Sequence, residues 1–257
     1  MSRTGRLRAQ VGADWHSFLR RRTAVFFTFL FPIILILIFG ALVGTDPSGG
    51  ALFGEPPGYY VAGYLAAVVV FTPLSRIGSE VARHREGSRF EKLATTPLSR
   101  TEWLVAQTVV NAAVIGVAGL LILALVVALT GATVIPNPLV VAYVAVAVVC
   151  FCGVGAVLGS YTDSRDGAVA ASNTIALPLL FLSDTFLTLE QLPGWFAPFV
   201  ELSPLTYFAR GVRAASYPDA QVSAVAGVDP AVANLVILAV LAVPAFVVGA
   251  RSIPETD

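Results

Sequence analysis

The sequence predicts an all-α polytopic membrane protein with six transmembrane helices. Two observations support this fold class. Apolar residues make up 56% of the 257 residues and charged residues only 12%, and long windows without a charge recur along the chain. A soluble domain has about 45 to 50% apolar residues, with glycine counted, and about 25% charged residues. A sphere of this size cannot cover so much apolar side chain, so the composition excludes an ordinary water-soluble enzyme.

Charge and cysteine counts exclude several kinds of site. Sixteen basic and sixteen acidic residues cancel, so no global field attracts nucleic acid, and no nucleic-acid partner is expected. Cys150 and Cys152 form a C-x-C pair inside an apolar run, which is neither a disulfide framework nor a zinc pattern. His16 and His84 are the only histidines and are too far apart in sequence to suggest a metal cluster. We therefore predict no metal site and no catalytic residue.

The chain also lacks a phosphate-binding loop. Its only lysine, Lys92, follows Glu91, whereas a Walker A motif has glycine before the lysine. No segment outside the expected spans exceeds about 45 residues, which is less than an independent nucleotide-binding domain needs. If ATP drives this protein, a separate chain binds the nucleotide.

Six windows are long and apolar enough to cross a hydrocarbon core of about 30 Å, which needs about 20 helical residues. The stretch from Trp103 to Thr162 has no charge and is twice as long as one helix requires. Gly131, Pro136 and Pro138 predict a break inside it. The expected spans are residues 23–43, 57–76, 103–130, 139–161, 167–187 and 230–250. Together with their connections they form a single transmembrane domain over the whole chain.

The basic residues predict the orientation in the membrane. Six spans place both termini on one side, together with the connection between the second and third spans. Of the sixteen Arg and Lys residues, only Arg210 and Arg213 fall on the other side. Because positive residues are retained on the cytoplasmic side, we expect a multi-pass protein of the cell membrane with both termini in the cytoplasm.

The N-terminal segment, residues 1–22, predicts an amphipathic helix. Leu7, Val11, Trp15 and Phe18 follow one another at spacings of 4, 4 and 3 residues, which places them on one helical face. A basic amphipathic helix beside a span is expected to lie in the plane of the lipid headgroups. It serves either as an interfacial anchor alone or also as a contact for a cytoplasmic partner.

The connection between the second and third spans, residues 77–102, carries two capping-box patterns. The first is Ser88 with Glu91, and the second is Ser99 with Glu102. Each pattern predicts the start of a helix. The connection is therefore expected to hold one short helix, followed by a second helix that continues directly into the third span.

The short helix is predicted to run from about Arg89 to Thr96 and to end before Pro97. Its apolar face consists of Phe90, Leu93 and Ala94. A short helix joined rigidly to a span transmits displacement instead of bending, as a docking element requires. The alternative is a solvated basic loop that only satisfies the orientation rule.

The longest outer segment, residues 188–229, begins with an aromatic, proline-rich stretch. Residues 192–200 are too short to span, so we expect them to lie in the outer interface or to dip partway into the membrane. Residues 206–215 are expected to form a helix that carries Arg210 and Arg213. The alternative is an aromatic belt without a further role.

Polar residues inside the spans are candidates either for a substrate pathway or for helix contacts. They are Gln107 and Asn111 in the third span and Ser172, Asn173 and Thr174 in the fifth. Because polar side chains in lipid commonly join helices, helix contact is the favoured interpretation.

Two motifs on predicted opposite faces complete the pattern. The first has an acidic residue and glycine, then a short helix with Glu and Leu, then a proline. It is carried by Arg85, Glu86, Gly87, Ser88, Phe90, Glu91, Leu93, Thr96 and Pro97. The second is carried by Pro193, Trp195, Pro204, Leu205, Tyr207, Arg210 and Arg213. In this order, and over nearly the whole chain, the arrangement resembles the membrane subunit, or permease, of an ABC type-2 transporter, although Ser203 stands where Asn is common.

The resemblance implies a mechanism. Such permeases have a coupling helix between spans two and three and short re-entrant helices before span six. Two permease chains, identical or merely similar, are implied to form the pathway of an exporter. Each would dock through residues 88–96 on a separate ATP-binding subunit, which would hold ATP and Mg, while this chain would hold no cofactor. Relatives carry hydrophobic drugs, lipids or polysaccharides.

Two other functions stay open. An ion-coupled secondary transporter needs paired acids near the bilayer centre, but Asp184 is the single acid within the expected spans and is near an outer end. A non-transporting membrane assembly protein is the second alternative. An intramembrane hydrolase is excluded because the chain has no G-x-S-x-G motif and neither histidine falls within an expected span.

Overall fold

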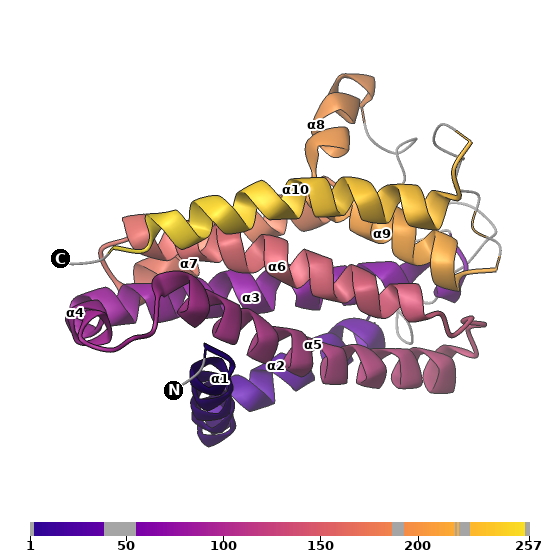
Figure 1. The fold of residues 1–257 in the computed structure, drawn as a ribbon. Coiled ribbons are helices and arrows are strands. Elements are labelled where there is room, and N and C mark those ends of the chain that lie inside the picture. Colours follow the sequence, from indigo (N-terminus) through magenta and orange to yellow (C-terminus); the bar gives the residue numbers. More distant parts are fainter. Residues whose placement is uncertain (1–2, 39–54, 187–192, 219, 221–226, 255–257) are drawn as a thin grey trace.

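The chain folds into an elongated bundle of helices. The computed structural model describes residues 3–38, 55–186, 193–218, 220 and 227–254, and within these ranges it contains helices and no strand. The helices run largely side by side, and the two described ends of the chain lie toward the same end of the bundle (Figure 1). The structure therefore confirms the all-α fold class.

Four helical units are long and apolar enough to cross a membrane. They are Pro57–Glu86, which joins the 3-10 turn η2 (Pro57–Tyr60) to α3 (Val61–Glu86), and the helices α5 (Arg100–Thr130), α6 (Pro138–Tyr161) and α10 (Pro230–Ser252). They correspond in order to the second, third, fourth and sixth predicted spans.

The helices in the first and fifth predicted spans are shorter. Helix α2 (Arg22–Leu35) has 14 residues and α7 (Arg165–Phe181) has 17, whereas one crossing needs about 20 residues. Residues 39–43 and 187 of these two predicted spans lie outside the described residues. The described part of the chain thus contains four candidate spans, and the six-span arrangement stays a prediction.

Helix α3 is longer than the second predicted span, 57–76. Residues 77–86 fall within the predicted loop, but they continue the helix to Glu86. The charge of Glu80 does not interrupt it, because this buried carboxylate forms ion pairs with Arg21 and Arg83. The basic residues of the last turn also suit the negative end of the helix dipole.

The centre of the bundle is α3, which is buried without a break from Val61 to Val70. It packs against α5, α6 and α7, and α10 packs along α6. Glycine makes the contact between α6 and α10 close, because a Cβ atom at Gly153 would collide with the backbone of Ala245. Small residues permit such close approach between helices in lipid, where burial from water does not drive association.

The predicted break between the third and fourth spans is confirmed. Helix α5 ends at Thr130, and Gly131 follows with a φ of 65°, which is the left-handed conformation that favours glycine. Helix α6 begins at Pro138, whose missing N–H costs nothing in a first turn. The Asn137 side chain caps it by accepting a hydrogen bond from the Leu139 N–H at 2.9 Å.

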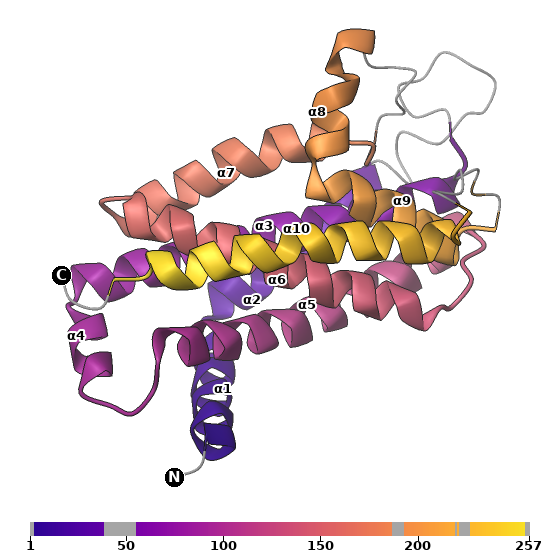
Figure 2. The same ribbon diagram turned by 45° about the horizontal axis from the view of Figure 1, so that its top comes forward.

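The predicted N-terminal helix is present as α1 (Arg3–Arg20). Its apolar face is covered by α5, because Phe18 packs with Val110 and Val114, and Val11 and Trp15 join the same cluster. Helix α1 runs across the long axis of the bundle (Figure 2), which is the direction expected of a helix in the headgroup plane.

The outer segment contains the 3-10 turn η4 (Gly194–Phe196) and the helices α8 (Ala197–Leu202) and α9 (Pro204–Ser216). Helix α9 packs against α10, α3 and α6. Helix α8 projects away from the bundle in both views (Figure 1, Figure 2). Residues 188–192, 219 and 221–226 of the predicted outer segment lie outside the described residues.

Candidate functional site

Charged residues gather at the end of the bundle that holds both described chain ends. Helix α4 (Arg89–Ala94) lies there, together with the C-terminal ends of α3, α6 and α10 (Figure 1). We call this region the α4 end. The opposite region, where α9 packs on η2 and the end of α7, is called the α9 end. The two predicted motifs lie at these two ends.

Helix α4 is held by an aromatic cluster. Phe90 is 2% exposed and lies between two rings from other helices. Its ring centroid is 5.1 Å from that of His84 on α3 and 5.6 Å from that of Trp103 on α5. His84 and Trp103 are themselves 5.2 Å apart. Because aromatic pairs at such distances stabilise beyond their buried area, this cluster fixes α4 against two long helices at once.

The other faces of α4 are open. Leu93 is half-buried against the core, on the same side as Phe90, as its sequence pattern predicts. The exposed residues around it are Ser88, Glu91, Lys92, Thr96 and Pro97. A short rigid helix with one anchored face and one polar face is therefore presented to the surroundings.

The first predicted capping box is wrong. Ser88 precedes α4, but it has a φ of 46° and its side chain makes no capping hydrogen bond. An N-cap residue normally has extended backbone angles, which aim its oxygen at the N–H groups of the first turn. The left-handed backbone of Ser88 removes that geometry. The glycine before it, Gly87, has a negative φ of −103°.

The second predicted capping box is confirmed. The Ser99 hydroxyl accepts from the Glu102 N–H at 3.2 Å, and the Glu102 carboxylate accepts from the Ser99 N–H at 3.0 Å. The same carboxylate accepts from Arg6 on α1 at 3.2 Å. Glu102 therefore joins the start of α5 to α1.

Arg85 and Glu86 of the predicted motif bind within the chain. The Arg85 guanidinium donates to the carbonyl oxygens of Ser160 and Thr162, at 2.7 and 3.1 Å. The Glu86 carboxylate accepts from the Arg165 N–H at the start of α7, at 2.9 Å. These bonds tie the last turn of α3, next to α4, to α6 and α7.

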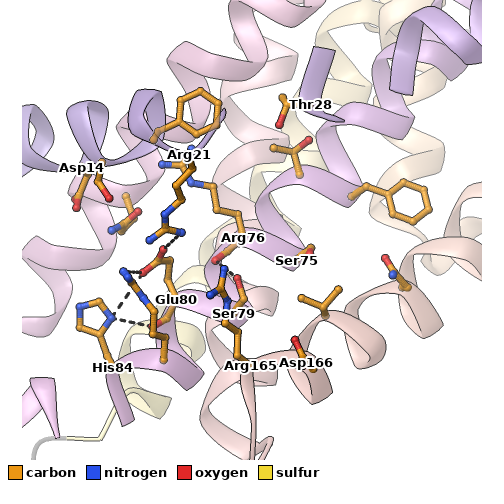
Figure 3. A pocket seen from close by; sticks show the side chains of 18 of the residues that line it. Asp14, Arg21, Thr28, Ser75, Arg76, Ser79, Glu80, His84, Arg165 and Asp166 are labelled. Atoms are coloured by element: carbon orange, nitrogen blue, oxygen red, sulfur yellow. Dashed lines mark hydrogen bonds and ion pairs between the residues drawn. The ribbon is translucent and has the colours of Figure 1, made fainter. Parts of the chain in front are cut away.

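A buried acid in α3, Glu80, is central to the α4 end but is missing from the predicted sites. Its side chain is 6% exposed and forms an ion pair with Arg21, which lies between α1 and α2 (Figure 3). It forms a second ion pair with Arg83. The His84 ring contacts its backbone carbonyl at 2.8 Å. The spacing of Arg83 and His84, three and four residues after the acid, was the one available signal. The other partner, Arg21, is too distant in sequence to be inferred.

A cavity of about 1010 Å³ opens beside Glu80. Side chains from α1, α3 and α7 surround it (Figure 3). Two of the predicted polar residues, Gln107 on α5 and Asn173 on α7, line this cavity. Pockets of this volume are large enough for a drug-sized ligand.

The other three predicted polar residues make local bonds. The Ser172 hydroxyl donates to the carbonyl oxygens of Ala168, at 2.7 Å, and of Leu74 on α3, at 3.2 Å, so it is a helix contact. Asn111 is buried and donates to the Gln107 carbonyl at 2.9 Å. Thr174 is exposed. Of the five candidates, two therefore line the cavity, one (Ser172) joins α7 to α3, and two (Asn111 and Thr174) bond within their own helices.

Asp14 also lines the cavity, from α1. Burial raises the pKa of its carboxyl to about 6, against the opposing effect of a hydrogen bond from the Gln10 amide at 3.0 Å. Asp14 is therefore a group in the cavity wall that changes charge near neutral pH.

The charges of the α9 end are paired with one another. Asp184 follows α7, and its carboxylate meets Arg210 Nε at 2.9 Å and Arg213 Nη1 at 3.4 Å. The Arg213 side chain is 5% exposed, and its Nη2 donates to the Asp184 and Thr185 carbonyl oxygens at 2.7 and 2.8 Å. Its guanidinium also lies 3.8 Å from the centre of the Tyr59 ring. This cluster clamps α9 onto η2 and the end of α7.

The remaining outer-motif residues shape α8 and α9. Pro204 occupies the first turn of α9, Leu205 is fully buried, and the Tyr207 hydroxyl donates to the Glu201 carbonyl at 2.6 Å. Pro193 precedes η4, and Trp195 is 72% exposed. In the part of the chain that the structure describes, no three His, Cys, Asp or Glu side chains are placed to hold a metal ion.

A comparison with models of known protein families identifies the family of this chain. The family model of the ABC-2 type transporters matches residues 6–217, a stretch that includes α4, Asp184 and α9. A search among curated proteins finds no match to the chain. The family match covers most of the chain, and several helices are apolar enough to cross a membrane. The chain therefore belongs to the ABC-2 type transporter family, whose members are multi-pass membrane permeases of ABC transporters.

Proposed function

We propose that this permease is the pathway-forming subunit of an exporter and that α4 is its coupling helix. In this proposal the α4 end faces the cytoplasm, in the cell membrane. Two permease chains together form the pathway through six spans each. A separate ATP-binding subunit, which holds ATP and Mg, docks on the exposed side of α4 and drives the change between inward and outward access.

The geometry of α4 is the observation that supports the proposal most strongly. Its side chain Phe90 is locked between His84 and Trp103, while Glu91 and Lys92 are exposed. Displacement of α4 by a docked protein would move α3 and α5 together. To transmit motion from a docked subunit to the spans, an element must be exposed and rigidly connected to long helices, as α4 is.

The bonds beside α4 extend the same connection. Arg85 links the end of α3 to α6, and Glu86 links it to α7. A load applied at α4 would therefore reach four helices within a short distance. A solvated loop that served only to retain positive charge would not need these contacts.

An ion-coupled mechanism has little support in the described residues. The only acid of the predicted spans, Asp184, is held by two arginines at the α9 end. An ion-coupled pathway needs paired acids near the bilayer centre, and a single carboxylate engaged by arginines at one end of the bundle does not supply them. ATP-driven coupling through a partner subunit is therefore the better account.

The orientation is tested by cysteine labelling in intact cells. Ser88→Cys and Gly194→Cys, each introduced after Cys150 and Cys152 have been replaced, are expected to react with a membrane-impermeant maleimide from opposite sides. Only Gly194→Cys should be labelled from outside. Labelling of both positions from the same side would contradict the proposed arrangement.

Coupling is tested by purification of the tagged permease from its own cells. A subunit with Walker motifs is expected to copurify, and charge reversal at Glu91→Lys with Lys92→Glu should remove most of it without changing the amount of permease. Arg251→Gln is the matched control, because Arg251 is an exposed basic residue of the same end outside α4. Equal retention of the subunit by the reversal variant would overturn the role of α4.

A further inference from the structure

The cavity at the α4 end changes character along its length. Its lining on α3 runs from Val68 through Phe71 and Thr72 to Arg76 and Glu80. Val68 and Arg76 are eight residues apart, which corresponds to about 12 Å along a helix axis. On α7, Asp166 and Arg165 likewise lie nearer the α4 end, and Leu177 and Val169 lie farther from it. One part of the wall is therefore apolar, and the other is charged.

The charged part carries an excess of cations. Its basic side chains are Arg21, Arg76, Arg83, Arg89 and Arg165, and its acidic side chains are Asp14, Glu80 and Asp166. Glu80 is engaged by Arg21 and Arg83. Among the described residues, the other three arginines, Arg76, Arg89 and Arg165, form no ion pair with an N···O distance of 4.0 Å or less. Two of them, Arg76 and Arg165, lie on the facing helices α3 and α7.

Buried polar atoms in the same wall lack partners. Arg76 Nη1 and Gln107 Oε1 are both buried and make no hydrogen bond in the part of the chain that the structure describes. Both residues line the cavity. A buried donor without a partner destabilises the folded chain, and it does so more strongly when it is charged. An acceptor supplied by a bound molecule would remove this destabilisation at Arg76.

We propose that the cavity binds an amphiphile with an anionic headgroup, such as a phosphate ester, and an apolar tail. The headgroup is held by Arg76 and Arg165, and the tail lies along Val68, Phe71 and Leu177. This inference deepens the proposed function, on which it rests, by naming the chemical class of the molecule that the permease takes up from the α4 end.

The arrangement of charged and apolar side chains in the cavity wall disfavours three other kinds of ligand. A cationic amphiphile would be repelled by the unpaired arginines, and a neutral one would leave Arg76 Nη1 without an acceptor. A small anion such as inorganic phosphate would leave the apolar wall uncovered. Arginines without an ion pair, next to an apolar wall, fit a ligand that has both an anionic group and an apolar chain.

The proposal is tested by fluorescence anisotropy. The full chain, with any ATP-binding subunit that accompanies it, is placed in phosphatidylcholine nanodiscs. The probe is a dodecyl phosphate with a fluorophore at the end of its chain, and the comparison is the same labelled chain with a trimethylammonium headgroup. Signals are corrected with empty nanodiscs. The phosphate probe is expected to bind at least about tenfold more tightly than the ammonium probe.

Variants of the wall provide changes in both directions. Arg76→Gln and Arg165→Gln should each weaken binding of the phosphate probe by about tenfold. Asp166→Asn should tighten it by about threefold, because it removes a repelling charge. This gain cannot arise from damage to the fold. The matched control Arg251→Gln should leave binding unchanged.

A packing role of Arg76 is tested separately. Its guanidinium lies 4.6 Å from the centre of the Phe18 ring, so Phe18→Leu removes this contact without removing a charge. Phe18→Leu should keep most of the binding. Weakening by Phe18→Leu that equals that of Arg76→Gln would overturn the role of Arg76 as a headgroup ligand.

Competition distinguishes the source of the ligand. Displacement of the probe by phosphatidylglycerol built into the nanodisc would identify a membrane lipid, and displacement only by added dodecyl phosphate would identify a free amphiphile; both support the proposal. Equal competition by inorganic phosphate, or equal binding of both probes, would overturn it. If the Walker-motif subunit still copurifies and hydrolyses ATP in that case, the proposed export function stands and only the ligand class is wrong.

Discussion

The two ends of this permease handle charge in opposite ways. At the α9 end, the Asp184 carboxylate forms ion pairs with both Arg210 and Arg213. The buried Arg213 also donates hydrogen bonds to two backbone carbonyl oxygens. In the cavity at the α4 end, the paired acid Glu80 lies beside three further arginines that have no ion pair among the described residues, namely Arg76, Arg89 and Arg165. The first arrangement is closed, and the second leaves charge available.

This difference shows how the same residue type serves two purposes. An arginine that is surrounded by acceptors contributes to packing and has no capacity left for a ligand. An arginine in a cavity wall without an acceptor retains that capacity, at a cost in stability. We infer that the α9 end holds the bundle together, whereas the α4 end receives a partner and a ligand.

The largest effect is expected from breaking the clamp at the α9 end. Arg213→Leu should lower the stability by about 3 to 5 kcal/mol, because it leaves buried partners unpaired. The measurement is the midpoint of thermal unfolding in detergent micelles. Arg210→Leu is the control and should cost clearly less, since its second partner, Glu201, is 48% exposed. Equal losses in the two variants would contradict the clamp.

A smaller loss is expected when α4 is released. Phe90→Ala removes the centre of the cluster with His84 and Trp103 and should cost about 3 kcal/mol, with most of the change confined to α4. Trypsin should then cleave faster at the exposed Arg89 and Lys92. Phe199→Ala on α8 is the control, because this ring is 58% exposed. Unchanged cleavage of the Phe90→Ala variant would show that the ring does not hold α4.

The pH dependence at Asp14 should be smaller again. Its pKa is raised in the folded protein to about 6, so its contribution to stability is present below about pH 4 and is lost as the pH rises through 6. Asp14→Asn should match the wild type at pH 4 and exceed its stability by roughly 1 to 3 kcal/mol above pH 7. Thermal unfolding at several pH values measures this difference. A difference that does not vary with pH would contradict the raised pKa.

The smallest effect concerns the turn before α4. Ser88→Gly should stabilise the protein by up to about 1 kcal/mol, because a left-handed backbone is costly for residues other than glycine. Gly87→Ala should be tolerated, since the φ of Gly87 is negative and the nearest atoms to an added Cβ are 3.5 Å away. Thermal unfolding compares the two variants. Strong destabilisation by Gly87→Ala, with no gain from Ser88→Gly, would show that the left-handed residue had been assigned wrongly.

Local sequence patterns predicted much of the helical layout. Gly131 and Pro138 predicted the break between α5 and α6, and Ser99 with Glu102 predicted the cap of α5. The spacing of Leu7, Val11, Trp15 and Phe18 predicted α1. These signals work because each depends on residues within a few turns of one another.

The features that escaped prediction depend on distant partners. Helix α3 continues past Arg76 because Arg21 helps to neutralise Glu80. The first capping box failed although its sequence is correct, because Ser88 adopts the left-handed turn that places Phe90 between its two aromatic neighbours. The cavity is lined by helices that are far apart in sequence, so no local motif could have predicted it.

The central claim is that the exposed side of α4 receives the ATP-binding subunit. A photoreactive benzoyl-phenylalanine in place of Lys92, and another in place of Trp195 in the outer segment, test it in intact membranes; both side chains are exposed. We predict that ultraviolet light joins the Lys92 variant, and not the Trp195 variant, to a protein with Walker motifs. Absence of this product from the Lys92 variant, while the complex still copurifies, would contradict the account.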